Sequence, residues 1–185
     1  ERVVVVHSDL SQFYDRVRPS LLNSKIQPFL PDADDGFRDL VANALQWSWD
    51  PRDARDVARY ASESDIDDFT SIALPQGLVS AGFFANVVLA DFDGVLRLAK
   101  QTAIEPGMRI LDCARYVDDL RIVMSVARDI SLDQVRQVVA DWLQRLLDGT
   151  VPGMKVSSEK TQASAIRGEE RPLVRQSQKM TRIQS

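Results

Sequence analysis

Cysteine is nearly missing from the sequence: Cys113 is the only one, which excludes a fold held by internal disulfide bonds and suits a reducing compartment. Long apolar runs are missing too. No stretch approaches the roughly 20 residues that a membrane-spanning helix needs, and the first residues lack the basic-then-apolar pattern of a signal segment. We therefore expect a cytoplasmic protein with no membrane partner.

Basic residues are fewer than acidic ones, with 23 Lys and Arg against 27 Asp and Glu, a net charge of −4 and a pI near 5.1. This balance counts against nucleic-acid binding, because phosphate contacts usually come from Lys and Arg clusters. A metal site made of carboxylates would itself be acidic, however, which weakens the objection. Basic side chains also recur near helical spacing at Arg167, Arg171, Arg175, Lys179 and Arg182. Residues 167–185 are predicted to be a basic tail or the start of a connection to a further domain.

The 185 residues are enough for one domain with a real core, and 44% hydrophobic and 27% charged residues are ordinary for a globular protein. Glu1 is followed at once by an apolar run, Val3 to Val6. Chains seldom begin in this way, so we expect a fragment of a longer chain.

The first half of the chain alternates one strand with helices. A β-rich, continuously apolar run over residues 2–7 predicts a strand buried on both faces, ending at Ser8 and Asp9. Helices are expected over residues 13–22, 35–47 and 50–61, with an acidic loop at 63–68 and an extended piece at 72–77. Asp35 could cap the second helix, and its apolar side chains share one face: Phe37, Leu40, Val41, Ala44 and Leu45.

The second half is dominated by a hairpin pattern. A long apolar helix is predicted over residues 80–101, and β-rich runs follow at 108–117 and 120–126, separated only by Asp118 and Asp119. An amphipathic helix over 131–147 should end at Gly149, and residues 154–165 could supply one or two short strands. This order predicts an α+β fold, with a small, mainly antiparallel sheet and helices packed on one face, as in a ferredoxin-like core.

In such a fold the end of the first strand can lie beside the tip of the hairpin. We therefore expect Asp9, Asp118 and Asp119 to form one carboxylate cluster. Mg²⁺ prefers oxygen ligands and needs only a few carboxylates, and paired Mg²⁺ ions can drive nucleotide addition to a 3′-hydroxyl. The alternative, three solvated turn acids, fits poorly because two of them interrupt a hydrophobic hairpin.

Four segments in order resemble the palm motifs of reverse transcriptases. The first is Asp9-Leu10-Ser11-Gln12-Phe13-Tyr14-Asp15, the second is Leu74-Pro75-Gln76-Gly77 continuing to Phe84-Ala85-Asn86, the third is Tyr116-Val117-Asp118-Asp119, and the fourth is Lys160-Thr161. Each motif alone is weak, but four in the right order cover nearly the whole chain. The resemblance implies a polymerase palm over residues 1–166 with a helical, fingers-like insertion at about 35–70.

The resemblance implies a role for each matching residue. Asp9 and Asp118 would ligate the metals, with Asp119 and the backbone carbonyl of Leu10 completing the shell, and Mg²⁺ as the cofactor or Mn²⁺ in its place. Lys160 would act on the leaving pyrophosphate. Five matching residues would contact the nucleotide, and Tyr14 among them would exclude the ribose 2′-hydroxyl: Leu10, Tyr14, Gln76, Gly77 and Asn86.

The implied activity is RNA-directed DNA polymerisation from deoxynucleoside triphosphates on an RNA or DNA template and primer. Fingers and thumb segments of the same chain are the further partners that the family requires. Ala81-Gly82 stands where group II intron and retron enzymes carry Ser-Pro, and Arg115-Tyr116-Val117-Asp118-Asp119-Leu120-Arg121 is also distinctive. These departures resemble the abortive-infection and other defence-associated bacterial enzymes. The group II intron or retron type remains the alternative.

Two other functions stay open: an RNA-directed RNA polymerase, against which Tyr14 counts, and a catalytically silent binding module that kept the fold. Beyond the helical insertion no fingers or thumb is recognisable, so we expect residues 1–185 to polymerise poorly or not at all alone. No primer-grip turn is evident after Lys160 unless Arg167-Gly168-Glu169 is its remnant.

Several residues also have plain structural interpretations. Asp15 could cap a helix, Tyr116 could be a packed strand aromatic, Asn86 a helix-surface residue and Lys160 a solvated one. His7 is expected to be a strand residue without chemistry. The three tryptophans and the cysteine are expected in the core: Trp47, Trp49, Trp142 and Cys113.

Overall fold

The computed structural model describes residues 1–30, 34–67 and 69–166, and these fall into two compact units. The first unit contains Glu1–Leu10, Asp93–Leu146 and the described residues from Val156 onward, and the second contains Ser11–Phe92 and Leu147–Lys155. The predicted basic tail and the possible primer-grip remnant lie outside the described residues. Each unit is described by itself below.

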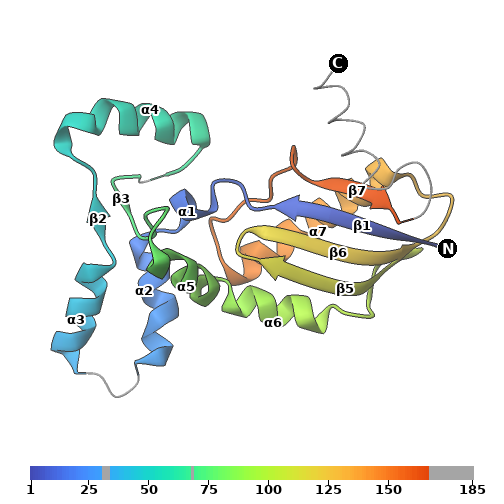
Figure 1. Cartoon of the computed structure of the whole chain (residues 1–185), viewed down its shortest axis with the longest axis horizontal. Helices are drawn as coiled ribbons and strands as arrows, with labels where there is room; N and C mark the ends of the chain where they lie inside the picture. The colour runs from blue at the N-terminus through green and yellow to red at the C-terminus, as the bar shows by residue number, and fades with distance from the viewer. Residues whose placement is uncertain (31–33, 68, 167–185) are drawn as a thin grey trace. The chain divides into compact units, whose positions relative to one another are not determined.

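A five-stranded antiparallel sheet forms the first unit, in the order β4-β5-β6-β1-β7. Figure 1 shows β1, β6 and β5 side by side, with α7 behind them. The bounds are β1 Arg2–Asp9, β4 Ala103–Glu105, β5 Met108–Tyr116, β6 Asp119–Val126, α7 Leu132–Thr150 and β7 Gln162–Ala165. The predicted α+β class with a small antiparallel sheet and helices is confirmed.

One face of this sheet is buried and the other is open at β1. Val4, Val6 and Ser8 on β1 are fully buried and pair with equally buried residues of β6. The alternate residues point the other way, and Val3 is 40% exposed. The prediction that the first strand is buried on both faces is therefore wrong: a period of two puts every second side chain on the uncovered face.

Helix α7 covers the buried face with an apolar stripe at helical spacing: Val135, Val139, Trp142, Leu143 and Leu147. Its start is capped by Ser131, whose hydroxyl accepts a hydrogen bond from the Gln134 N–H at 3.1 Å. Gly149 does not end the helix, which continues to Thr150 because the fully buried Val151 lies beyond it. Gly153, with φ 87°, is the glycine of the following turn.

The second unit is mainly helical. Its elements are α1 Phe13–Arg16, α2 Pro19–Ile26, η1 Gln27–Phe29, α3 Asp35–Ala44, β2 Trp47–Ser48, η2 Pro51–Asp53, α4 Ala54–Ser64, β3 Ser71–Ile72 and α5 Val79–Val88. Helix α2 packs against α5, and β2 pairs with β3 (Figure 1). The predicted helix over residues 13–22 is two helices, because Pro19 fits only the first turn of a new one.

Helix α3 has no buried residue although its sequence is amphipathic, and Leu40 is 63% exposed. Amphipathicity gives a helix an apolar face but does not supply a partner for it. The capping residue is Asp34, whose side chain accepts from the Phe37 N–H. Asp50 and Pro51 do start a helical segment, as predicted, and α4 runs on to Ser64.

The predicted long helix over residues 80–101 is divided at Leu89 into α5 and α6, Ala90–Leu98. In the described part of the chain no single helix is long and apolar enough to cross a membrane. The bent pair α5 and α6 passes such a test together on length and composition alone. Six apolar residues between Val79 and Leu98 are instead buried in the protein: Ala81, Ala85, Val88, Leu89, Phe92 and Leu96.

Candidate active site

Two of the predicted carboxylates face each other at one end of the sheet. Asp9 is the last residue of β1 and Asp119 is the first residue of β6, and they are direct partners in the antiparallel register. Both follow the alternation that places Ser8 and Leu120 on the buried face, so their own side chains lie on the open face. The Asp9 side chain is 15% exposed and that of Asp119 is 52% exposed.

Asp118 lies between them in a two-residue turn. Tyr116 and Asp119 close the hairpin, and Val117 adopts a left-handed backbone with φ 56°. A β-branched residue rarely takes this conformation, which costs about 1–3 kcal/mol and persists only where the surroundings hold it. The Leu10 N–H donates to the Asp118 carbonyl at 3.1 Å, so the end of β1 is joined to the turn.

The three carboxylates affect one another electrostatically. Burial raises the pKa of Asp118 above its ordinary value, and the negative charges of Asp9 and Asp119 raise it further. A hydrogen bond from its own backbone N–H and the charge of Lys160 act in the opposite direction. A site with this balance favours a bound cation, which would relieve the repulsion.

Lys160 supplies positive charge at this site. Its ammonium donates to Asp9 Oδ1 at 3.0 Å, and this bond raises the pKa of Lys160. The side chain is 66% exposed but it is not simply solvated. Two contacts hold the segment around it: the Ser157 N–H donates to the Asp9 carbonyl at 2.8 Å, and the buried hydroxyls of Ser8 and Thr161 lie 2.8 Å apart. The predicted neighbours Asp9, Leu10, Asp118, Asp119 and Lys160 therefore lie together.

The donor atoms at this end of the sheet fit a hard cation. In residues 1–30, 34–67 and 69–166 no three His, Cys, Asp or Glu side chains converge at ligand distances. The Asp9 carboxylate instead holds the Lys160 ammonium, and Asp119 Oδ1 lies 3.5 Å from His7 Nε2. Mg²⁺ usually takes one or two carboxylates plus waters and substrate phosphates, so two or three neighbouring aspartates meet its needs.

The predicted nucleotide-contacting residues belong to the second unit. Tyr14 is half-buried on α1, and its ring lies edge-on to Phe13 with centroids 5.4 Å apart. Gln76 and Gly77 lie in the turn between β3 and α5, where Gly77 has φ 95°, a conformation that favours glycine. Asn86 is exposed on α5 and donates to the Gly82 carbonyl of its own helix at 3.1 Å.

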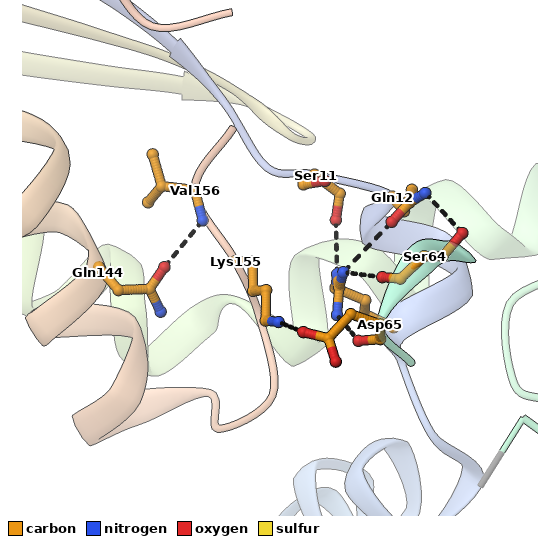
Figure 2. A network of polar contacts seen from close by, with 8 residues as sticks. Ser11, Gln12, Ser64, Asp65, Gln144, Lys155 and Val156 are labelled. Carbon is orange, nitrogen blue, oxygen red and sulfur yellow. Dashed lines mark hydrogen bonds and ion pairs between the residues drawn. The ribbon is translucent and has the colours of Figure 1, made fainter. Parts of the chain in front are cut away.

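A buried arginine organises the segment around Tyr14. This residue is Arg16, which is 7% exposed. Figure 2 shows its partners Ser11, Gln12, Ser64 and Asp65 close together. The guanidinium donates to the Ser11 carbonyl at 3.1 Å, the Asp65 carbonyl at 3.1 Å and the Ser64 carbonyl at 2.7 Å. Burial lowers the pKa of Arg16, and the charge of Asp65 opposes this. These bonds attach the end of α4 to α1.

Two further contacts join the same segments. The Tyr60 hydroxyl donates to Asp15 Oδ2 at 2.5 Å, and Lys155 pairs with Asp65 (Figure 2). The interpretation that Asp15 caps the following helix is wrong: Asp15 lies within α1, α2 has no side-chain cap, and Asp15 instead accepts from Tyr60 of α4. Nothing in the sequence pattern marked Arg16, which directly follows the last residue of the first motif, since arginines are mostly exposed.

Other structural interpretations have mixed outcomes. Tyr116 is 81% exposed, so it is not a packed aromatic. Trp142 is in the core as predicted, but Trp47 is 48% exposed because β2 is only two residues long and pairs on one side. Trp49 and Cys113 are half-buried and not in the core as predicted, and Trp49 packs on Phe69 with centroids 5.2 Å apart. His7 is a strand residue of β1 whose side chain is 48% exposed.

A protein-family model matches this chain. The family model described as "Reverse transcriptase (RNA-dependent DNA polymerase)" matches residues 1–181, which is nearly the whole chain. No curated protein matches the chain at a significant level.

Two solved structures resemble the chain at 15% identity over 88% of its length: apo telomerase from Candida tropicalis, truncated from its C-terminal domain, and telomerase from Candida albicans with the TWJ fragment of telomeric RNA. The TM-scores are 0.42 and 0.48. The match covers 30% and 27% of those chains, so this chain spans less than a third of their length. Neither likeness bears on what this chain binds.

Proposed function

Because the chain belongs to the reverse transcriptase family, we propose that the sheet end carrying Asp9, Asp118 and Asp119 holds divalent metal for RNA-directed DNA synthesis. The observation that carries this proposal is the register pairing of Asp9 with Asp119, with Asp118 in the turn between the strands. Two paired strand ends and the short turn between β5 and β6 bring the carboxylates together, which gives the preorganised geometry that a metal site requires.

The proposed roles are those that the resemblance to the family implies. Asp9 and Asp118 would be the main ligands, with Asp119 and the Leu10 carbonyl beside them, for Mg²⁺ or Mn²⁺. When bound, the metal would lower the pKa of the attacking 3′-hydroxyl and stabilise charge on the leaving pyrophosphate. Lys160, which stays cationic because its contact with Asp9 raises its pKa, would neutralise the same pyrophosphate.

The second unit would supply nucleotide selection. Tyr14 lies on a segment fixed by the Arg16 hydrogen bonds, so its ring can act as a steric limit at the sugar 2′ position. The turn at Gln76 and Gly77 and the exposed amide of Asn86 would contact the incoming deoxynucleoside triphosphate and the template.

The wider biological assignment rests on sequence features alone. We propose that residues 1–185 belong to a longer, cytoplasmic bacterial enzyme with a role in phage defence, on the basis of Ala81-Gly82 and the Arg115 to Arg121 segment. The fingers and thumb would come from other segments of that chain. The group II intron or retron type is the alternative within the family.

The test is nucleotide addition by the full-length protein, with and without an RNA template and a DNA primer. We expect Mg²⁺-dependent incorporation of deoxynucleotides that Asp118→Ala abolishes. Asp133→Ala is the matched control, because this carboxylate is 95% exposed in the first turn of α7. No incorporation by a folded wild-type protein under any template condition would instead support a silent binding module.

A further inference from the structure

Arg115 carries a buried charge next to the turn of the hairpin. Its side chain is 6% exposed, and it lies on β5 opposite the fully buried Leu120. A register shift between Ile110 and Asp112 reverses the alternation of β5, so that Arg115 faces inward and Tyr116 outward. A buried guanidinium needs partners on every side to offset its desolvation.

Helix α6 provides the first partner. Arg115 Nε lies 2.6 Å from Asp93 Oδ1, and Arg115 Nη2 lies 2.5 Å from Asp93 Oδ2. This two-bond arrangement matches the planar fork of arginine and fixes the orientation of the guanidinium as well as its position. Asp93 therefore aims the third nitrogen of Arg115 in a set direction.

That third nitrogen contacts the turn itself. Arg115 Nη1 donates to the Val117 carbonyl at 2.7 Å. On the other side of Asp118, the Leu10 N–H donates to the Asp118 carbonyl at 3.1 Å. The carbonyl groups before and after the Asp118 Cα are thus both held, and together they set the direction in which its side chain leaves the backbone.

The backbone of the turn requires such support. Val117 has φ 56°, which a β-branched side chain disfavours, so a free turn would relax toward a different conformation. Relaxation would rotate the peptide group between Val117 and Asp118, which is the group that Arg115 holds.

From these contacts we infer that Arg115, anchored by Asp93, is a positioning residue: it keeps the strained turn at Val117 in the conformation that aims Asp118 at the metal site. The inference rests on the proposed function for its activity readout. This role differs from that of a purely structural ion pair between strand and helix. The effect of losing a purely structural pair would not depend on the conformation of Val117.

The activity test is a double-mutant cycle in the full-length protein between Arg115→Met and Val117→Gly. Arg115→Met should lower kcat by about 10- to 100-fold, as losses of residues supporting metal ligands do, with little change in KM. Glycine takes positive φ freely, and the hairpin twist favours the turn. The same change in a Val117→Gly background should therefore cost less than about threefold.

Two variants complete the design. Lys100→Met is the matched control, because it removes another ion pair to β5, the 2.5 Å contact with Asp112, away from the turn. It should leave kcat unchanged. Arg115→Lys can reach Asp93 or the Val117 carbonyl but not both, so it should rescue little, and it replaces Arg115→Met if that variant does not fold.

A second readout does not depend on activity. Hydrogen exchange of the Leu10 amide reports whether the Asp118 carbonyl stays in place, and Arg115→Met should speed it by about tenfold unless Val117 is glycine. Additive effects in the cycle and an unchanged Leu10 amide would overturn the inference. Absent nucleotide addition with the expected Leu10 exchange would overturn the proposed function and leave the positioning role supported.

Discussion

Asp118 is the carboxylate of the site whose surroundings oppose its charge. Burial and the neighbouring Asp9 and Asp119 raise the pKa of Asp118, so its ionised form is disfavoured in the folded protein. The resulting loss of folding stability is absent below the unfolded pKa of about 3.9, where Asp118 is protonated in both states. It develops as the pH rises from there through the folded pKa.

This balance predicts that Asp118→Asn stabilises the metal-free protein at neutral pH while it removes activity. Thermal unfolding should show a gain in Tm at about pH 7 that shrinks toward about pH 4. Asp133→Asn, at a carboxylate that is 95% exposed, should show no such pH-dependent gain. A gain of the same size at both pH values would mean that the ionisation of Asp118 is not responsible.

Cys113 offers a separate test of burial on β5. Burial raises the pKa of its thiol to about 11, with the charge of Asp112 adding to the effect. The thiolate is the reactive form, so alkylation by iodoacetamide at about pH 8 should be roughly 100-fold slower than in the urea-unfolded chain. Equal rates in the folded and unfolded protein would show that the thiol is not shielded as described.

Among single residues, the site carboxylates that end a strand or interrupt a hairpin could be predicted from the sequence. Asp9, Asp118 and Asp119 were recognisable because carboxylates there break an apolar pattern. The contacts of Lys160 with Asp9 and of Arg115 with Asp93 were not predictable, since each joins residues far apart in the chain. Arg115 faces inward only because of the bulge in β5, which no residue pattern announces.

Among the elements, α1 and α4 depend on one buried side chain. Arg16→Met would leave the carbonyls of Ser11, Ser64 and Asp65 without a donor. We expect a loss of about 3 kcal/mol in the free energy of unfolding in urea. Arg59→Met removes an arginine that is 70% exposed on α4 and should cost less than about 0.5 kcal/mol.

If both substitutions lowered the free energy of unfolding equally, the buried hydrogen bonds of Arg16 would contribute no more than an exposed arginine does. The result bears on function because the same bonds fix the segment that carries Tyr14.

Element boundaries were predictable where a local signal exists. Pro51 after Asp50 and the serine cap of α7 both mark real starts. The exposure of α3 was not predictable, because an amphipathic pattern identifies an apolar face but not the element that would cover it. Likewise Gly149 lies inside α7, where packing beyond it outweighs a modest helix penalty.

For the whole molecule, the two units divide the chemistry. The carboxylates and Lys160 belong to one unit and Tyr14 to the other. Sequence order predicted both sets through the motif resemblance, but only tertiary contacts show which residues lie together.

This division predicts separable effects on rate and on sugar selection. In the full-length protein, Tyr14→Ala should raise ribonucleotide incorporation relative to deoxynucleotide incorporation by about 10- to 100-fold. Tyr14→Phe keeps the ring and should preserve discrimination. Ratios of kcat/KM for the two nucleotides check this. Unchanged discrimination in Tyr14→Ala would show that Tyr14 does not select the sugar.

The central claim is that the sheet end at Asp9 and Asp118 binds divalent metal. Paramagnetic Mn²⁺ broadens the NMR signals of nearby amides, so Mn²⁺ titration with a deoxynucleoside triphosphate locates the ion directly. We expect selective loss of the signals of Asp9, Leu10, Asp118 and Asp119, and their recovery in Asp9→Asn at the same Mn²⁺ concentration. Broadening centred on other acidic residues of a folded protein, unchanged by Asp9→Asn, would contradict the account.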